Sequence, residues 1–142
     1  MIWQKPHISK TYEALTAIAD NRIEVEGNKA KCVSSSKGKF YQIEYDPETN
    51  SIMSNDNSAY YTDSLSYPMI ALLMLKGKVH YNEKLLEILK GIFWKDINQK
   101  FKNDYTKAVG SVLEDLQAKG EDIEFIQTEV QKIHEFVCTL EM

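Results

Sequence analysis

One uncharged run of apolar residues dominates the pattern of the chain. Residues 67–75 carry no charge and are almost entirely hydrophobic, which predicts a helix buried on every face. Pro68 suits the first turn of that helix and Gly77 suits its end. The run is too short to cross a bilayer, which takes about 20 residues. We therefore expect the remaining elements to pack around this central helix.

Before this run, residues 22–54 follow the two-residue period of β-strands. The clearest alternation lies in 39–46, where one face carries Tyr41, Ile43 and Tyr45. Gly27-Asn28 predicts a tight hairpin turn, since both residues tolerate a positive φ. We expect a four-stranded antiparallel meander. In its first strand the alternation places Ile23 and Val25 on one face and Arg22, Glu24 and Glu26 on the other.

The remaining segments follow the three-to-four-residue period of amphipathic helices. A short helix is predicted from about Ser9 to Ala19, capped by Ser9. After Gly77, helices are predicted near 82–91, over 94–116 with a possible division at Asn103-Asp104, and over 123–140. We predict an α+β fold with a short N-terminal helix, a four-stranded antiparallel meander, a buried central helix and a C-terminal helical hairpin. All 142 residues are expected to form a single globular domain.

The charge of the chain is unevenly distributed. Residues 1–110 carry 15 basic and 13 acidic groups, whereas 111–142 carry 2 basic and 8 acidic groups. Arg22 is the sole arginine. This composition argues against recognition by several bidentate arginines, although lysines still supply a positive potential.

The two cysteines, Cys32 and Cys138, have no metal-ligand spacing, and we expect both to be free, buried thiols. The first ten residues lack the apolar segment of a signal peptide. We therefore expect a cytoplasmic protein that does not enter a membrane.

Motifs for catalysis, metals and cofactors are missing from the sequence. His7, His80 and His134 lack partners at zinc-ligand spacing, and neither a phosphate-binding loop nor a dinucleotide fingerprint occurs. The serines at 34–36 lack the setting of a nucleophile elbow and fit turn chemistry better. We expect no metal, no cofactor and no catalytic residue.

Lysines and aromatic residues alternate between 90 and 107. The candidate binding residues are Lys95, Lys100, Lys102 and Lys107. Together with nearby aromatic rings, such lysines can follow a phosphate backbone while bases stack. Alternatively, Trp94, Phe101 and Tyr105 fill the core and leave the lysines as a solvated face.

A polar segment, 54–64, precedes the central helix and is expected to be an exposed loop. It contributes two further candidate binding residues, Tyr60 and Tyr61, because loops on rigid scaffolds often carry function. A loop that merely joins the sheet to the helix is the alternative.

The sequence thus favours a non-catalytic binding or assembly module that contacts nucleic acid or a protein partner. One alternative is a small enzyme with a site near the 54–64 loop and His80, which requires Asp56 and the serines to line the same pocket. Another is a homodimer formed through the last helix, which requires Phe125 and Phe136 to be exposed together.

Overall fold

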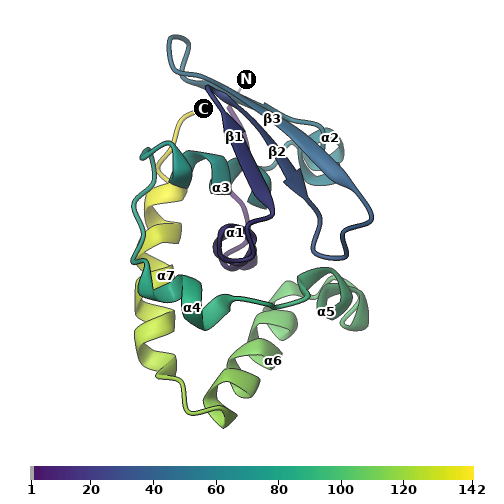
Figure 1. The fold of residues 1–142 in the computed structure, drawn as a ribbon, viewed down its shortest axis with the longest axis vertical. Coiled ribbons are helices and arrows are strands. Elements are labelled where there is room, and N and C mark those ends of the chain that lie inside the picture. The colour runs from purple at the N-terminus through teal and green to yellow at the C-terminus, as the bar shows by residue number, and fades with distance from the viewer. Residues whose placement is uncertain (1) are drawn as a thin grey trace.

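The strands predicted in the first half of the chain form one antiparallel sheet. In the computed structural model, which describes residues 2–142, the strands are β1 (Ile23–Glu26), β2 (Lys29–Val33), β3 (Phe40–Asp46) and β4 (Ser51–Ser54). They lie in the order β1-β2-β3-β4, each antiparallel to its neighbour (Figure 1). The predicted meander is confirmed.

The two faces of the sheet differ in polarity. The inner face is buried and carries Ala30, Cys32, Ile43, Tyr45 and Ile52. The outer face is exposed and carries Glu24, Glu26, Lys29, Lys31, Gln42, Glu44 and Met53. The alternation predicted for β3 is therefore observed, because successive side chains of a strand point to opposite faces.

The strand places Ile23 and Val25 on one face, opposite Cys32 and Ala30, as predicted, but the prediction for Arg22 was wrong. Arg22 is buried. Its Nη1 donates to the carbonyl oxygen of Val33 at 2.7 Å and lies 3.4 Å from the Tyr67 hydroxyl, so its polar group has partners inside the protein. Val25 is 40% exposed. The strand is an edge strand next to a hairpin turn, so the core covers only its beginning.

The central helix is buried as predicted. It is α3 (Tyr67–Leu75), in which every residue from Pro68 to Met74 is buried. It lies against the inner face of the sheet and contacts α1 (Ser9–Ala19). Ser9 does not cap α1. The backbone N–H of Ser9 instead donates to Nδ1 of His7 at 3.0 Å.

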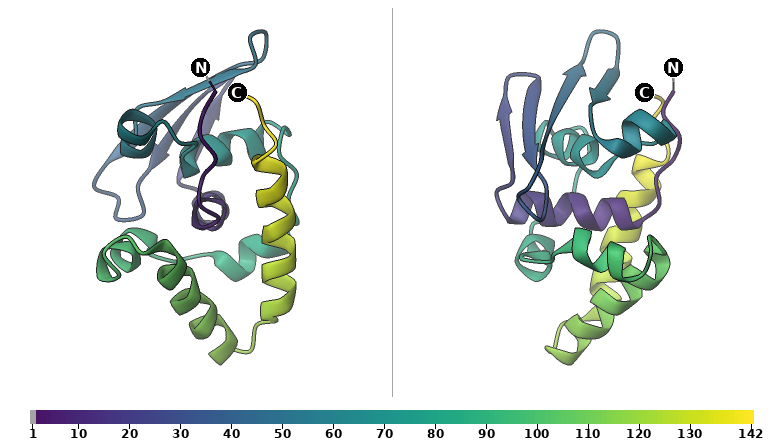
Figure 2. Two further views of the ribbon diagram at one scale, coloured as in Figure 1. Left: turned by 180° about the vertical axis from the view of Figure 1, so that it is seen from behind. Right: turned by 90° about the vertical axis from the view of Figure 1, so that its right-hand side faces the viewer.

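Four further helices cover α1 on the side away from the sheet. They are α4 (Lys84–Leu89), α5 (Trp94–Lys100), α6 (Tyr105–Ala118) and α7 (Ile123–Val137). Helices α4, α6 and α7 contact α1 directly, and α6 and α7 form the C-terminal helical hairpin (Figures 1 and 2). The α+β fold class is confirmed.

The segment 94–116 is divided into two helices. The division occurs where Lys102 and Asn103 adopt positive φ values of 52° and 63°, because a left-handed residue cannot continue a right-handed helix. Asp104 then caps α6 by accepting from the backbone N–H of Lys107 at 3.2 Å. Of the two possibilities left open by the sequence, the division is correct.

The prediction of a loop over 54–64 was wrong for its middle part. Residues Asn57–Thr62 form a helix, α2. Asp56 starts it, since its Oδ1 accepts from the backbone N–H of Ala59 at 2.9 Å. Such a side-chain cap stabilises a first turn by about 1 kcal/mol.

Candidate functional site

The loop between β2 and β3 is tightly folded by the serines predicted to be turn residues. The backbone N–H of Ser34 donates to the carbonyl of Lys39 at 2.8 Å, and that of Lys37 donates to the carbonyl of Ser34 at 2.8 Å. The buried Oγ of Ser34 also accepts from the N–H of Lys39 at 3.2 Å. This turn leaves Lys37 and Lys39 exposed.

The same loop is attached to the start of α5. The backbone N–H of Lys95 donates to Oγ of Ser35 at 3.1 Å, and its Nζ donates to Oγ of Ser36 at 3.4 Å. Figures 1 and 2 show the β2–β3 loop beside α5. Two lysine-containing segments that are about sixty residues apart in sequence therefore meet at one surface.

Helix α5 is held in place by buried contacts. The fully buried Trp94 donates from Nε1 to Oγ1 of Thr16 at 3.0 Å, and Thr16 donates to the carbonyl of Leu89 at 2.8 Å. Buried Asn98 donates to Oε1 of Glu13 at 3.3 Å. The lysines of α5 therefore extend from a scaffold fixed by the core.

We call the resulting cluster the basic surface. It consists of Lys37 and Lys39 of the loop, Lys95 and Lys100 of α5, and Lys102. None of the five forms an ion pair with any residue of 2–142. Asp96 is the one acidic residue within α5. The positive potential of this surface is thus weakly compensated.

Exposed aromatic rings adjoin the basic surface. Phe40, the first residue of β3, is 55% exposed, and Phe93, the N-cap residue of α5, is 60% exposed. The ammonium group of Lys31 lies 4.4 Å from the centroid of the Phe40 ring, within cation–π range.

The backbone at two of the lysines is unusual. Six non-glycine residues within 2–142 have a positive φ; four of them are Asn or Asp, and the other two are Lys37 and Lys102, with φ of 61° and 52°. Asn, Asp and Gly adopt this conformation more readily than a lysine does. At these two positions of the basic surface, the chain has lysine although asparagine or glycine fits the backbone better.

The predicted candidate residues separate into three groups. Lys95, Lys100 and Lys102 lie together on the basic surface. Lys107 differs from these three because it forms an ion pair, in which its Nζ lies 3.9 Å from Oδ2 of Asp104. Trp94 belongs to the buried core, whereas Phe101 and Tyr105 are half-buried, so the alternative that these rings fill the core holds for Trp94 alone of the three.

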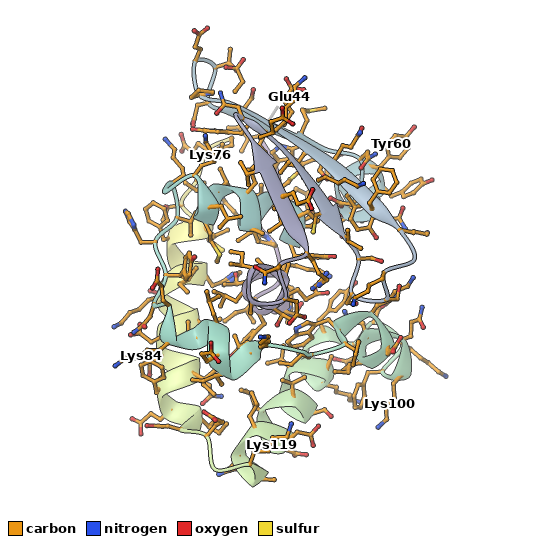
Figure 3. The ribbon with its side chains drawn as sticks, viewed as in Figure 1. Glu44, Tyr60, Lys76, Lys84, Lys100 and Lys119 are labelled. Carbon is orange, nitrogen blue, oxygen red and sulfur yellow. The ribbon has the colours of Figure 1, made fainter. Side chains whose placement is uncertain are left out.

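The predicted tyrosines are exposed but lie elsewhere. Tyr60 and Tyr61 of α2 are 71% and 76% exposed, with ring centroids 5.0 Å apart. Figure 3 places Tyr60 at the upper right, near the sheet, and Lys100 at the lower right. The structure therefore does not combine the tyrosines with the lysines of α5 in one cluster.

Sequence reasoning missed the loop half of the basic surface. Lys37, Lys39 and Phe40 belong to a hairpin whose pattern identifies a turn and a strand but not the neighbour of that turn. The clue that the sequence did hold was the run of serines at 34–36, since serine hydroxyls often bind nearby backbone groups. Two of these hydroxyls bind Lys95 instead of serving only their own turn.

The groups required for the enzyme alternative do not lie at one cavity. Asp56 is buried and accepts from the hydroxyls of Ser54 and Ser66, both at 2.5 Å. His80 is exposed in the segment after α3. Neither Asp56 nor His80 lines the hollow on the outer face of the sheet.

A thiol and an imidazole lie together near the C-terminus. Sγ of Cys138 is 3.5 Å from Nε2 of His134, whose Nδ1 is 3.2 Å from Oγ1 of Thr11. Burial raises the pKa of the Cys138 thiol and lowers the pKa of His134. A neutral thiol is a poor nucleophile, so this pair is better suited to packing than to covalent catalysis.

The phenylalanines of the last helix differ in exposure. Phe136 is 45% exposed, whereas Phe125 is half-buried and packs against the core. A second apolar face requires both rings to be exposed. Of the two, Phe136 meets this requirement and Phe125 does not.

Residues 2–142 contain no cluster of three or more His, Cys, Asp or Glu side chains placed to hold a metal ion. Across the same range, no helix is both long enough and apolar enough to span a bilayer. Cys32 and Cys138 are free, and of the two Cys32 is fully buried.

Comparisons with known proteins give a family but no activity. The family model described as Uncharacterised conserved protein UCP014422 matches residues 3–142. The chain therefore belongs to this family. No curated protein and no solved structure matches the chain.

Proposed function

We propose that this member of the family Uncharacterised conserved protein UCP014422 is a non-catalytic module that binds nucleic acid through the basic surface. The observation that carries the proposal is the attachment of Lys95 to Ser35 and Ser36, which joins the lysines of the β2–β3 loop to those of α5. The cytoplasmic location expected from the sequence is part of this proposal.

The arrangement of charge supports a polyanionic partner. The five lysines come from two segments that contact each other through Lys95, and the excess of acidic groups in the chain lies in 111–142. Each lysine that neutralises a phosphate releases condensed counterions, so affinity depends steeply on salt. Lysine acts as a point charge in such contacts and does not need the bidentate geometry of arginine. The scarcity of arginine is thus compatible with binding to the phosphate backbone.

The backbone at Lys37 and Lys102 supports the same proposal. A left-handed lysine costs about 1 kcal/mol relative to a residue that adopts this conformation freely. Both positions belong to the basic surface. A requirement for positive charge explains why lysine occupies them.

An enzyme site at 54–64 has less support. Asp56 serves as a helix cap, and His80 does not line the hollow on the outer face of the sheet. Dimerisation through α7 also has less support, because it requires both phenylalanines to be exposed and only Phe136 of the two is exposed. The proposal therefore rests on the basic surface.

The test is fluorescence anisotropy with labelled oligonucleotides of about 10 nucleotides, a length within the range of known single-strand sites. Single-stranded and duplex forms are titrated at about 50 mM and about 200 mM salt. We expect binding that weakens at the higher salt. The logarithm of affinity should fall with the logarithm of salt with a slope of about −2 to −4, as expected for three to five phosphate contacts.

Two double variants examine the two halves of the surface. Lys100→Glu with Lys102→Glu changes the α5 side, and Lys37→Glu with Lys39→Glu changes the loop side. Both should weaken binding and reduce the salt slope. The matched control is Lys84→Glu with Lys119→Glu, which alters the net charge equally at exposed positions remote from the basic surface (Figure 3).

Three results would refute the proposal. One is absence of binding at low salt. Another is binding that the control weakens as much as the surface variants do, because net charge alone would then explain it. The third is an effect of the α5 variant without any effect of the loop variant, because the two segments would then not act as one surface.

A further inference from the structure

The outer face of the sheet contains a hollow of about 770 Å³. No helix covers this face, since α1 and α3 lie on the other side (Figure 1). The side chains that line the hollow are mostly polar, and they include Glu24, Glu26, Lys29, Lys31, Gln42, Glu44, Met53 and Asn55.

Charges follow a definite order across this hollow. In the register of the sheet, Lys29 stands between Glu26 and Glu44, and Lys31 stands between Glu24 and Gln42. Three carboxylates thus lie beside two ammonium groups, and amides complete the lining. Such a hollow repels a phosphate but offers acceptors and donors to a neutral polar group.

Phe40 connects the hollow to the basic surface. It follows Lys39 directly, and its ring lies under the ammonium group of Lys31 at 4.4 Å. Gln42, two residues further along the same face of β3, lines the hollow. Lys39, the exposed ring of Phe40 and the polar hollow therefore follow one another from the start of β3 onward.

The far end of the hollow is acidic. Figure 3 shows Glu44 at the upper end of the sheet and Lys100 at the lower right. A phosphate backbone is therefore favoured near α5 and the loop, and disfavoured over the upper part of the sheet. The groups that can enter the hollow from such a backbone are its bases.

We infer that the partner of the basic surface is a single-stranded nucleic acid that stacks one base on Phe40 and places the polar edge of a neighbouring base in the hollow. This inference rests on the proposed function. Base stacking on an aromatic ring is a general mode of single-strand binding. In a duplex the bases are paired and stacked on one another, so neither Phe40 nor the hollow is used.

The lining also implies a preference among bases. A carboxylate accepts a hydrogen bond from the exocyclic amino group of cytosine, whereas thymine presents a carbonyl at that position. Glu24 and Glu44 supply carboxylates. Asn55 already accepts from the backbone N–H of Gln42 through Oδ1 at 2.9 Å, so its amide NH₂ is the group directed to a ligand. Cytosine is therefore expected to bind better than thymine.

The experiment compares labelled dC and dT octamers, and a mixed-sequence strand with its duplex, at low salt. We expect dC to bind better than dT, and the single strand to bind better than the duplex. Phe40→Ala should weaken single-strand binding about 5-fold to 100-fold, the range of one stacked base, and should leave duplex binding unchanged. Glu24→Ala with Glu44→Ala should reduce the difference between dC and dT, because these carboxylates are the acceptors for the amino group of cytosine.

Phe136→Ala is the matched control, because it removes another exposed ring at a distance from the sheet. It should leave all affinities unchanged. Phe40, Glu24 and Glu44 are all exposed, so none of these substitutions opens a cavity in the core. Intrinsic fluorescence of the buried Trp3 and Trp94 verifies the fold.

The outcomes separate this inference from the proposed function. Binding that the lysine variants weaken and Phe40→Ala does not would overturn the inference while leaving the proposed function intact. Equal affinity for single strand and duplex would do the same. Absence of any binding would overturn both.

Discussion

The side-chain amide of Asn98 on α5 donates a hydrogen bond of 3.3 Å to the carboxylate of Glu13 on α1, inside the protein. Nζ of Lys10 lies 3.0 Å from the other carboxylate oxygen of Glu13 and 4.1 Å from the centroid of the Tyr105 ring. The buried carboxylate thus joins α1 to α5, and Lys10 extends the junction to α6. The position of the lysines on α5 depends on this junction.

Glu13→Ala is expected to lower the free energy of unfolding by about 3 kcal/mol, because it leaves a largely buried ammonium group and a buried amide without their acceptor. Urea denaturation gives this value. In the double variant Lys10→Met with Glu13→Met, both charges are removed, so the loss should be smaller than the sum of the two single losses. Glu114→Ala, at an exposed site of α6, should change stability by less than about 0.5 kcal/mol. A similarly small loss for Glu13→Ala would show that the junction is not needed.

The histidines predict a loss of stability in weak acid. Burial lowers the pKa of His134 below its usual 6.5, nearby His7 lowers it further, and Glu135 partly opposes them. The unfolded chain therefore binds the proton more tightly, so stability should fall as pH decreases below about 6.5. The pKa of His7 is lowered as well, first by burial and then by Lys10.

His134→Gln tests this pH dependence by thermal unfolding between pH 7.5 and pH 5.5. The variant should show a flatter profile, since glutamine does not titrate and can still bind the Thr11 hydroxyl. Glu13 acts in the opposite sense. Burial raises its pKa, so its protonation at low pH favours the folded state. If the stability of the wild type rises toward pH 5.5, the carboxylates dominate its pH dependence and the expectation for His134 is wrong.

The two thiols should differ in their reactivity. Cys32 is fully buried, and burial raises its pKa to about 11, with Arg22 partly opposing it. Cys138 is half-buried and its pKa is also raised by burial. A thiol reagent at pH 8 should therefore modify Cys138 slowly and Cys32 only after denaturation. Rapid modification of both thiols in the native protein, with Cys138→Ser as the reference for Cys32, would contradict the observed burial.

The parts of the fold that the sequence predicts well are those with a strong local period. The alternation of 39–46 and the apolar run of 67–75 appear as β3 and α3, since each pattern suits one element and one kind of burial. Arg22 was predicted on the wrong face because its partners, Val33 and Tyr67, are distant in sequence. Helix α2 was missed because it is only six residues long and depends on the cap at Asp56.

The candidate site was predictable only in part for the same reason. The lysines of α5 stand out as a local cluster, so the sequence identifies that half. Lys37 and Lys39 join them through two serine hydroxyls that contact Lys95 across about sixty residues. Neither period nor composition specifies a contact of this kind. Phe40 is a candidate binding residue because it lies on the exposed outer face of the sheet. Strand periodicity does not distinguish an exposed face from a covered one.

Substitutions at Lys37 and Lys102, the two lysines with positive φ, can separate an effect on binding from an effect on stability. Lys37→Asn and Lys102→Asn each remove a charge while introducing a residue that adopts a positive φ more readily. Each substitution should raise the free energy of unfolding by roughly 0.5–1 kcal/mol, and together they should raise Tm by a few degrees. Nucleic-acid binding should weaken in the same double variant, because two phosphate contacts are lost.

Lys84→Asn with Lys119→Asn is the control for this separation, since it removes the same charge where the backbone is right-handed or helical. Asparagine has a lower helix propensity than lysine, so this double variant should be slightly less stable than the wild type and should bind unchanged. A protein that is more stable yet binds less well cannot owe its weaker binding to misfolding. If Lys37→Asn with Lys102→Asn stabilises the chain and binding persists at full strength, the lysines at these two positions serve some purpose other than contact with a polyanion.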